Sequence, residues 1–441
     1  MAGRGLILAA PASGSGKTLI VAGLLRHLRR RGIRVAAAKA GPDYIDPTFH
    51  AAASGAPCVN LDVWAMRPAT LAGLVHELEA DAELVLCEGV MGLFDGTGPN
   101  GETGSTAALA HCTGWPVVLV VDARGQGASA AALIAGFARH DPALPLAGII
   151  FNRIAGRRHR AMLEAALARH LPGLPCFGGM PLQAGLILPE RHLGLVPADE
   201  ATEGEAVIER AAAAVEAALD IAGLVGLARP SGLSGASVAV ALLPLGQRIA
   251  VARDDAFLFA YPSVLKGWRR EGATVSFFSP LADEPPDPNA DAVYLPGGYP
   301  ELHAGRLAAA GNFIAGLRDP AAAGKPVYGE CGGYMVLGEA LTDAEGRSHR
   351  MAGLLPLMTS FAERRLHLGY RALTLLRDGP LGSAGARFRG HEFHYATTIS
   401  ASGDGALFAV TDSWGTDLGT AGLRRASVAG SFIHLIDRED G

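Results

Sequence analysis

The first half of the chain alternates short apolar runs with stretches of helical periodicity, and this alternation constrains the fold more than any other feature. The apolar runs span residues 6–10, 35–40, 84–88, 117–122 and 146–152. Each run is largely apolar on both faces, as in parallel strands that are covered by helices. The pattern predicts a doubly wound parallel α/β domain that extends to residue 228. In such a sheet, ligands bind at the carboxyl ends of the strands.

The first run continues into PASGSGKT and then into a helix. A glycine-rich turn between a strand and a helix can surround phosphate oxygens with backbone N–H groups. Lys17 can reach the β- and γ-phosphates of ATP, and Thr18 can ligate Mg²⁺. The usual GxxxxGK[ST] pattern begins with glycine where this chain has Pro11. This departure resembles the variant loops of dethiobiotin synthetase-like proteins.

Asn152, at the end of a later run, can pair its amide with adenine or cap a turn. The expected ATP contacts in the loop are Ser13, Gly14, Ser15, Gly16, Lys17 and Thr18.

Acidic side chains follow two of the later runs. The segment GPDYIDP places Asp43 and Asp46 on either side of Tyr44. We expect these three residues to position substrate and Asp43 also to ligate Mg²⁺, with turn-forming aspartates as the alternative. Glu88 ends an apolar run, where an acid does not help the core, and is expected to be a further Mg²⁺ ligand. Asp95, in the loop that follows, is expected to face substrate.

A Pro-, Gly- and Ser-rich stretch, 228–237, then interrupts the pattern, and apolar runs near residues 248, 273 and 291 resume it. We therefore expect two α/β domains, residues 1–228 and 247–441, joined by a linker over 229–246. The alanine-rich segment 207–228 is broken by charged residues. It is expected to form one amphipathic helix and not a membrane span.

The segment VYGECGGYMVL, residues 327–337, predicts a strand, a sharp turn and a helix, with Cys331 at the turn. A nucleophile at such an elbow points out of the sheet, and the helix N-terminus favours its thiolate. A PGG loop at residues 296–298 ends another run. If the two turns meet, the N–H groups of Gly298 and Gly332 would form an oxyanion hole. The alternatives are a buried cysteine in a glycine-rich turn and a plain tight turn at the PGG loop.

The thiol needs a base, and His434 is the preferred candidate because it follows a short apolar run near the C-terminus. His391 and His394, in GHEFHY, are its rivals. We expect alternation along a strand to place both of them on one face, as in a substrate wall.

Composition excludes several classes of protein. At 441 residues the chain can form two or three domains, and a charged fraction of 18% is too low for a disordered chain. A net charge of −5 argues against general nucleic-acid binding. Five cysteines without CxxC spacing favour the reducing cytoplasm, and no apolar run suits a membrane.

Several motifs follow one another over nearly the whole chain: the phosphate loop, GPDYIDPTFH, CEGVMGLFDG, PGG, GECGGYMVLGEAL, GHEFHY and SFIHL. With them the chain resembles the cobyrinic acid a,c-diamide synthase family, whose aerobic-pathway members act on hydrogenobyrinic acid. The resemblance implies a P-loop NTPase-like amide synthetase domain of the dethiobiotin synthetase type and a class I glutamine amidotransferase domain of the cobyric acid synthase type. It implies a ligase that uses Mg²⁺, ATP and glutamine to amidate the a and c acetates of a corrinoid acid in cobalamin biosynthesis.

The resemblance also implies that Cys331 forms a thioester with glutamine and that His434 activates it. The usual class I glutaminase has a glutamate two residues after that histidine, where this chain has Ile436, and Asp437 is a candidate for the orienting role. The alternatives are diamidation of another tetrapyrrole such as nickel-sirohydrochlorin, amidation of other peripheral carboxylates, and a regulatory P-loop ATPase with an inert glutaminase-like domain. A homodimer is one option for the assembly.

Overall fold

A computed structural model describes residues 3–98, 100–182, 185–186, 190–191, 194–195, 204–234, 239–402 and 405–440. It divides into two compact units. Unit 1 comprises Met1–Trp64 and Pro68–Ala239, and unit 2 comprises Ala65–Arg67 and Val240–Gly441. Three residues from the first half of the chain thus belong to the second unit. Residues 235–238 of the expected linker lie outside the described residues.

Unit 1 is built on a seven-stranded parallel sheet with the order β3-β2-β4-β1-β5-β6-β7. The central strand β1 pairs with β4 on one side and β5 on the other. Every residue of β4 is buried, as expected for a strand covered on both faces. The parallel α/β fold predicted for this half is confirmed. The strands are β1 (Arg4–Ala9), β2 (Val35–Ala40), β3 (Val59–Leu61), β4 (Leu84–Glu88), β5 (Val117–Asp122), β6 (Leu146–Ile154) and β7 (Cys176–Pro181), with a short antiparallel pair, β8 (Glu190–Arg191) and β9 (Gly194–Leu195).

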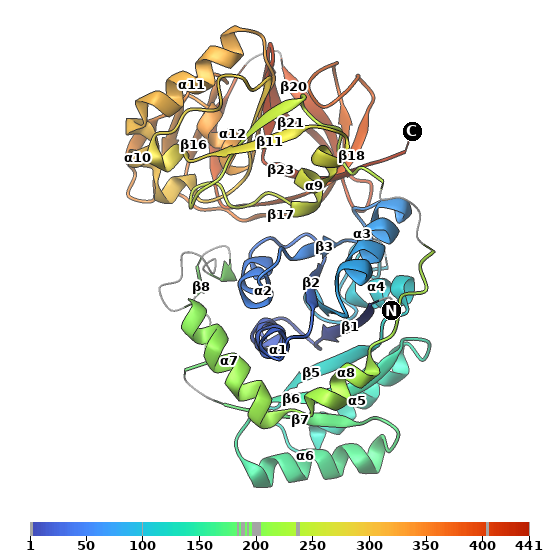
Figure 1. Ribbon diagram of the computed structural model, residues 1–441. Helices are drawn as coiled ribbons and strands as arrows, with labels where there is room; N and C mark the ends of the chain where they lie inside the picture. The colour runs from blue at the N-terminus through green and yellow to red at the C-terminus, as the bar shows by residue number, and fades with distance from the viewer. Residues whose placement is uncertain are drawn as a thin grey trace. The chain divides into compact units, whose positions relative to one another are not determined.

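Helices cover both faces of this sheet (Figure 1). Helix α1 packs against α2 and α7 on one face, and α3, α4 and α5 lie on the other. Among the described helices of the chain, none combines the length and the apolar character needed to cross a bilayer. The helices of unit 1 are α1 (Lys17–Arg30), α2 (Asp46–Ser54), α3 (Pro68–Asp81), α4 (Thr106–Thr113), α5 (Ser129–His140), α6 (Arg157–His170), α7 (Gly204–Ala218) and α8 (Ile221–Leu227).

The alanine-rich segment 207–228 forms parts of two helices, so the expectation of one helix was wrong. Asp220 lies between α7 and α8, and its carboxylate accepts a hydrogen bond from Gly223 N–H, which caps the start of α8. A side chain that can satisfy free N–H groups at this point allows a new helix to begin.

The start of the expected linker is held on unit 1. Gly5 and Arg229 exchange backbone hydrogen bonds of 2.8 and 3.2 Å. The buried carboxylate of Glu79 accepts hydrogen bonds from the Ser231 N–H and from Trp115 Nε1, at 2.7 and 2.9 Å. The chain therefore stays ordered on unit 1 for several residues beyond α8.

Unit 2 is built on a ten-stranded sheet with the order β11-β10-β12-β13-β22-β21-β20-β17-β18-β23. The strands from β11 to β22 are parallel, and the strands from there to β23 are antiparallel. The α/β class is confirmed, and the antiparallel half adds to the predicted pattern. The strands of this sheet are β10 (Arg248–Ala252), β11 (Thr274–Phe278), β12 (Ala292–Leu295), β13 (Val327–Glu330), β17 (His367–Leu375), β18 (Arg387–His394), β20 (Ala406–Asp412), β21 (Asp417–Arg425), β22 (Val428–Ser431) and β23 (Ile433–Arg438).

A smaller four-stranded sheet and several helices complete unit 2. The small sheet has the order β15-β14-β16-β19. Its strands are β14 (Ala340–Thr342), β15 (Ser348–Arg350), β16 (Leu357–Ser360) and β19 (Thr397–Ala401). The helices are α9 (Pro262–Arg270), α10 (Ala304–Ala309), α11 (Gly311–Ala322) and α12 (Gly332–Leu337), with 3₁₀ turns η1 (Pro280–Ala282) and η2 (Pro300–Leu302).

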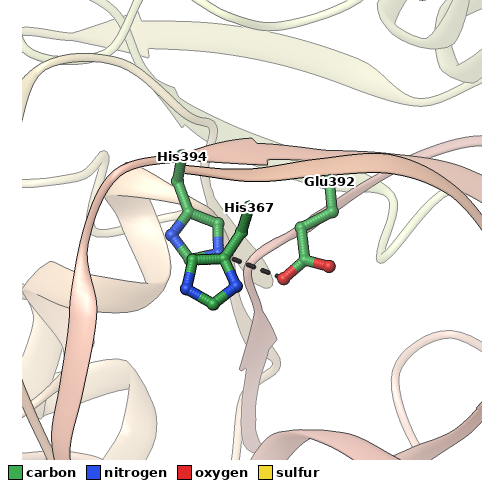
Figure 2. A group of neighbouring side chains, drawn as sticks. All are labelled: His367, Glu392 and His394. Carbon is green, nitrogen blue, oxygen red and sulfur yellow. Dashed lines mark hydrogen bonds and ion pairs between the residues drawn. The ribbon is translucent and has the colours of Figure 1, made fainter. Parts of the chain in front are cut away.

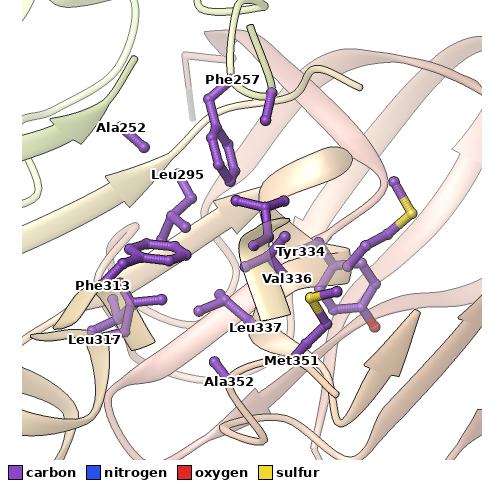
Figure 3. Close-up of a cluster of buried hydrophobic side chains, with 14 of the residues drawn as sticks. Ala252, Phe257, Leu295, Phe313, Leu317, Tyr334, Val336, Leu337, Met351 and Ala352 are labelled. Atoms are coloured by element: carbon purple, nitrogen blue, oxygen red, sulfur yellow. The ribbon is translucent and has the colours of Figure 1, made fainter. Parts of the chain in front are cut away.

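The core of unit 2 surrounds α12, all of whose residues are buried. Figure 3 shows Val336 and Leu337 of this helix among other apolar side chains, including Leu295 and Phe313. Gly333 permits the close packing of α12 on β12, because a Cβ at that position would lie 2.0 Å from Leu295 O. This packing fixes the N-terminal end of α12, where Cys331 lies.

Candidate active sites

The phosphate loop of unit 1 connects β1 to α1. Gly14 and Gly16 have φ values of 74° and 87°, which glycine adopts without strain. A side chain at Gly16 is also excluded sterically, because its Cβ would lie 2.3 Å from Asn152 Nδ2. Helix α1 begins at Lys17 without a side-chain hydrogen bond at its N-cap. Its first backbone N–H groups are therefore suited to hold phosphate oxygens.

Two residues at the end of β6 brace this loop. Asn152 Nδ2 donates to Ser15 O at 2.8 Å, and Arg153 Nη1 donates to Gly14 O at 2.6 Å. Arg153 Nη1 also lies 2.7 Å from Asp122 Oδ2. The amide of Asn152 thus binds the loop backbone in this structure, and its predicted contact with adenine stays a prediction. Ser13, at the tip of the loop, is exposed.

Lys17 and Thr18 both turn toward the segment at and after the end of β4. Lys17 Nζ donates to Met91 O at 2.7 Å, and Thr18 Oγ1 donates to Glu88 Oε1 at 2.8 Å. Burial lowers the pKa of Lys17, and the nearby Glu88 carboxylate opposes that shift. Strand β4 thus delivers an acid to the phosphate loop, as in other phosphoryl-transfer sites.

A buried charge cluster lies at the ends of β2 and β4, with Lys39 at its centre. Lys39 is 3% exposed. Its Nζ lies 2.5 Å from Asp46 Oδ2, 3.3 Å from Glu88 Oε1 and 3.8 Å from Asp43 Oδ2. Burial alone would lower the pKa of Lys39, but Asp46 and Glu88 outweigh burial and raise it. His50, which is fully buried, places Nε2 2.5 Å from Glu88 Oε2. Glu88 is therefore held by three protein donors.

Sequence reasoning missed Lys39 and His50. A single lysine inside the run VAAAKA carries a weak signal, since nothing local shows which strand will lie beside it. The parallel pairing of β2 with β4 places Lys39 directly opposite Glu88. Sheet order therefore creates this ion pair, and sheet order was not predicted.

The predicted Mg²⁺ ligands Thr18, Asp43 and Glu88 supply oxygen atoms, which suit a hard cation. Although burial opposes it, the charges of Lys39 and His50 hold the pKa of Glu88 well below its usual range. Burial and repulsion from Asp46 raise the pKa of Asp43 to about 8, even though 29% of its side chain is exposed. The oxygen donors fit Mg²⁺, and their role as ligands stays a prediction.

The predicted substrate-binding residues have different surroundings. Tyr44 is 6% exposed, and Asp46 is paired with Lys39. Asp95 is exposed, and its Oδ2 accepts a hydrogen bond from Gly92 N–H at 2.8 Å, which closes a turn. Their contacts with substrate stay predictions.

In unit 2, Cys331 lies at the junction of β13 and α12. Its φ of 46° and ψ of −104° are costly for a residue with a side chain, by about 1–3 kcal/mol. Such strain is a feature of strand-to-helix elbows that present a nucleophile. Burial, with a contribution from the charge of Glu301, raises the pKa of Cys331 well above its usual range. The resting side chain is therefore a thiol that needs a base.

The two predicted oxyanion residues lie against each other. A Cβ on Gly332 would be 3.0 Å from Gly298 N. The N–H of Gly332 faces the sulfur of Cys331, where its hydrogen bond lowers the pKa of the thiol and so opposes the effect of burial. Gly333 N–H is engaged with Pro296 O at 3.0 Å. The two turns that carry Gly298 and Gly332 lie close together, as an oxyanion hole built from both would require. The role of the Gly298 and Gly332 N–H groups stays a prediction.

His434 lies on β23 and is fully buried. A Cβ on Gly297 would lie 2.9 Å from His434 Nε2 and 3.3 Å from Cys331 Cβ, so the imidazole and the cysteine border the same small space. Burial lowers the pKa of His434 to about 3, and the neighbouring His391 and His394 add repulsion. A neutral imidazole can accept the thiol proton. The structure thus brings the predicted base beside the predicted nucleophile.

A carboxylate close to His434 belongs to Glu330, which sequence reasoning missed. Glu330 Oε2 lies 3.8 Å from His434 Nδ1, and the side chain is 3% exposed. The earlier candidate, Asp437, is instead held by Arg67, whose N–H and Nη2 lie 2.8 and 3.0 Å from its two oxygens. Its carboxylate is thus engaged by the Arg67 guanidinium. The sequence did contain one signal for Glu330, namely an acidic residue within the buried strand that precedes Cys331.

Strand β18 borders the same region and carries the two rival histidines. Cys331 Sγ lies 4.0 Å from Phe393 O, and His391 pairs with His434 across β18 and β23. His391 and His394 are three residues apart on this strand, so they face opposite sides, and the expectation of one shared face was wrong. Burial and the charge of Arg371 lower the pKa of His391 to about 3.

His367, Glu392 and His394 form a cluster whose ligand atoms lie within 4.8 Å of one another, close enough to hold a metal ion (Figure 2). Two features oppose that role. The two imidazole rings are stacked at 6°, so their in-plane lone pairs do not converge, and Arg371 Nη2 already lies 2.8 Å from Glu392 Oε2. Both ring nitrogens of His394 face acceptors, Ala396 O and Glu392 Oε1, each at 3.1 Å. Both nitrogens of His394 and one oxygen of Glu392 are thus already engaged within the protein, so we interpret the cluster as a hydrogen-bonded network.

Comparison with known protein families matches both units. The model described as the CobQ/CobB/MinD/ParA nucleotide binding domain matches residues 6–196. The model described as the CobB/CobQ-like glutamine amidotransferase domain matches residues 248–440. The first match contains the phosphate loop and the charge cluster, and the second contains the cysteine elbow and His434.

Similar proteins extend over nearly the full chain. The hydrogenobyrinate a,c-diamide synthase of Brucella anthropi is 53% identical, and the match covers 98% of each chain. The protein of that name from Rhizobium meliloti is 53% identical over 98% of this chain and 99% of its own. The one from Rhodobacter capsulatus is 54% identical over 98% of each.

Proposed function

Because the chain belongs to the hydrogenobyrinate a,c-diamide synthase family, it is a glutamine-dependent ligase of cobalamin biosynthesis, and we propose the substrate, chemistry and residue roles that follow. The substrate is hydrogenobyrinic acid or its cobalt-containing counterpart, cobyrinic acid, and the products carry amides at the a and c acetate groups. ATP and glutamine as co-substrates support a cytoplasmic reaction.

The single observation that carries the proposal is that one chain holds a buried Cys–His pair and a phosphate loop beside a cluster of acids. A carboxylate does not react with ammonia at neutral pH, because its oxygen is a poor leaving group. Transfer of the γ-phosphoryl group of ATP converts the carboxylate into an acyl phosphate and releases ADP. Ammonia then attacks the acyl carbon, and phosphate leaves. Two amidations consume two ATP and two glutamine molecules.

Unit 1 performs the activation step. The backbone N–H groups of residues 13–18 bind the phosphates, and Lys17 offsets negative charge on the transferred group. Thr18, Asp43 and Glu88 would hold Mg²⁺, which neutralises phosphate charge when bound. Lys39 pairs with Asp46 and Glu88, and its charge helps to keep Glu88 ionised. Tyr44 and Asp95 contribute to the substrate side of the site.

Unit 2 supplies the ammonia. His434 takes the proton of Cys331, and the thiolate attacks the side-chain amide carbon of glutamine. The N–H groups of Gly298 and Gly332 hold the oxyanion that forms. The C–N bond breaks as His434 returns the proton to the leaving ammonia, and a thioester remains. Water then cleaves the C–S bond to give glutamate and restore the thiol.

The proposal is tested by incubating the protein with MgATP, glutamine and each corrinoid acid, and by following glutamate release and product mass. We expect products in which one and then two carboxylic acids have become amides. Cys331→Ala should abolish the use of glutamine and keep synthesis from ammonium salts. Glutamate release without any amidated corrinoid would contradict the substrate. Loss of both activities in Cys331→Ala would contradict the division of roles between the units.

A further inference from the structure

We propose that Glu330 is the positioning residue that orients His434 and stabilises its protonated form during glutamine hydrolysis, an inference that rests on the proposed role of His434 as base. Glu330 is the last residue of β13, immediately before Cys331. In the usual class I glutaminase an acid lies two residues after the histidine. This chain has Ile436 there, and its side chain is buried and apolar.

The two edges of the His434 ring face different groups. Nε2 borders the space at Gly297 that Cys331 also borders, as described above. Nδ1, on the opposite edge, lies 3.8 Å from Glu330 Oε2. This is the order of a catalytic triad, in which the nucleophile and the acid act on different nitrogens of one imidazole. This separation is that of an ion pair once the ring is protonated.

Glu330 is itself fixed from two sides. Tyr294 Oη donates to Oε2 at 2.8 Å, and Leu435 N–H donates to Oε1 at 3.2 Å. Leu435 is the residue after His434, so one contact ties the carboxylate to the backbone that carries the base. A carboxylate held on both oxygens cannot turn away from Nδ1. Such supporting contacts are what a precise site requires.

Other groups around His434 are less suited to this role. Asp437 is held by Arg67. The backbone of Phe259 forms a hydrogen bond with the His434 ring, which helps to fix the ring but supplies no full negative charge. His391 and His394, on β18, oppose a positive charge on His434. Among the described groups around His434, Glu330 lies beside Nδ1 with a carboxylate that can stabilise the imidazolium.

Burial costs a carboxylate much of its favourable hydration, so an apolar residue would serve a purely structural role better. Burial raises the pKa of Glu330 to about 7, although the Tyr294 hydroxyl and Leu435 N–H oppose the shift. The carboxylate form thus becomes populated as pH rises through neutrality. Since only that form stabilises an imidazolium, glutamine hydrolysis is expected to rise over the same range.

Three variants test the inference. Glu330→Gln keeps the shape and removes the charge; its amide oxygen can still accept from Leu435 N–H, and its NH2 group can donate to the hydroxyl oxygen of Tyr294. Glu330→Asp keeps the charge on a shorter side chain. Glu79→Gln is the matched control, because Glu79 is also a buried glutamate whose carboxylate accepts hydrogen bonds, from Trp115 Nε1 and from the N–H and hydroxyl of Ser231, and it lies in unit 1. Glutamate release gives kcat and KM for glutamine, and synthesis from ammonium salts reports on unit 1.

We expect Glu330→Gln to lower kcat for glutamine hydrolysis by about 100-fold or more, with KM for glutamine nearly unchanged. The rise in activity through neutral pH should disappear, and ammonium-driven synthesis should persist. Alkylation of Cys331, followed by peptide mass spectrometry, should also slow, because less thiolate forms. Glu330→Asp should recover at least part of the activity, and Glu79→Gln should match the wild-type rate.

Several outcomes would overturn the inference. A Glu330→Gln protein with wild-type kcat or an unchanged pH profile would show that the charge is not used. Equal losses in Glu330→Gln and Glu330→Asp would assign Glu330 a structural role only. Full glutamine hydrolysis by a His434→Ala protein would instead refute the base in the proposed function, which separates failure of that assignment from failure of this one.

Discussion

Replacement of Lys39 by methionine tests whether the charge cluster of unit 1 depends on one buried cation. The methionine keeps an unbranched chain of similar length but no charge. Three carboxylates, those of Asp43, Asp46 and Glu88, lie within 4 Å of Lys39 Nζ and would lose their shared partner. Removing one member of a buried ion pair costs about 3–5 kcal/mol. His50 remains beside Glu88 and can offset part of this loss, so we expect about 3 kcal/mol.

Hydrogen exchange measured by mass spectrometry is the appropriate assay, because a chain with two units does not unfold in a single two-state step. A loss of about 3 kcal/mol should speed exchange in peptides from β2, β4 and α2 by on the order of 100-fold. Peptides from β10 and β12 in unit 2 should exchange as in the wild type. Lys325→Met is the control, because Lys325 Nζ donates to a backbone carbonyl, that of Ala290, at 2.6 Å. That variant should change exchange in β2 and β4 by less than the experimental scatter.

The effect should depend on pH in a definite direction. Without Lys39 the carboxylates relieve their repulsion by binding protons, and Asp43 already has a pKa raised to about 8. The loss of stability should therefore be larger at mildly alkaline pH than at mildly acidic pH. The variant should also lose ammonium-driven synthesis and keep glutamine hydrolysis. Unchanged exchange in β2 and β4, or a loss that does not vary with pH, would refute the reasoning.

Two further predictions concern the metal ligands. Glu88→Gln should leave exchange in unit 2 unchanged and abolish amide formation from either glutamine or ammonium salts, and normal turnover would remove Glu88 from the site. Because a protonated carboxyl cannot ligate a cation, Mg²⁺ affinity in the presence of a non-hydrolysable ATP analogue should rise as pH increases through about 8, where Asp43 ionises. Calorimetry should show that rise in the wild type and a flatter profile in Asp43→Asn, and identical profiles would exclude Asp43 as a ligand.

The features that sequence predicted well are local ones. The phosphate loop is a strand, a glycine turn and a helix that follow one another, and Cys331 lies in the same kind of segment. In both cases the glycines are needed for positive φ or close packing, which leaves a direct mark in the sequence. The local geometry at these points follows from a short stretch of chain, so it can be predicted without knowledge of the rest, and the chemical roles stay predictions.

The features that sequence missed depend on which strands become neighbours. Lys39 meets Glu88 because β2 pairs with β4. Glu330 reaches His434 because β13 pairs with β22, which leads directly into the strand of His434. Strand order is set by the packing of helices and loops over the whole unit. The spacing of apolar residues along the chain predicts strands but not which strands become neighbours. The expectation for His391 and His394 failed for a simpler reason, since side chains three apart on a strand alternate to opposite faces.

The contact between Arg67 and Asp437 also bears on how the gene for such a protein can be divided. A fragment that starts at Val240 contains Asp437, whose side chain has no exposed surface, but lacks Arg67, which binds both of its oxygens. A buried carboxylate without its cation costs about 3–5 kcal/mol, a large part of the stability of a single domain. The ammonia-producing half is thus completed by residues encoded within the synthetase half. Glutamine hydrolysis would therefore depend on the intact polypeptide. A fragment that starts at Val240 would be poorly able to hydrolyse glutamine without amide synthesis.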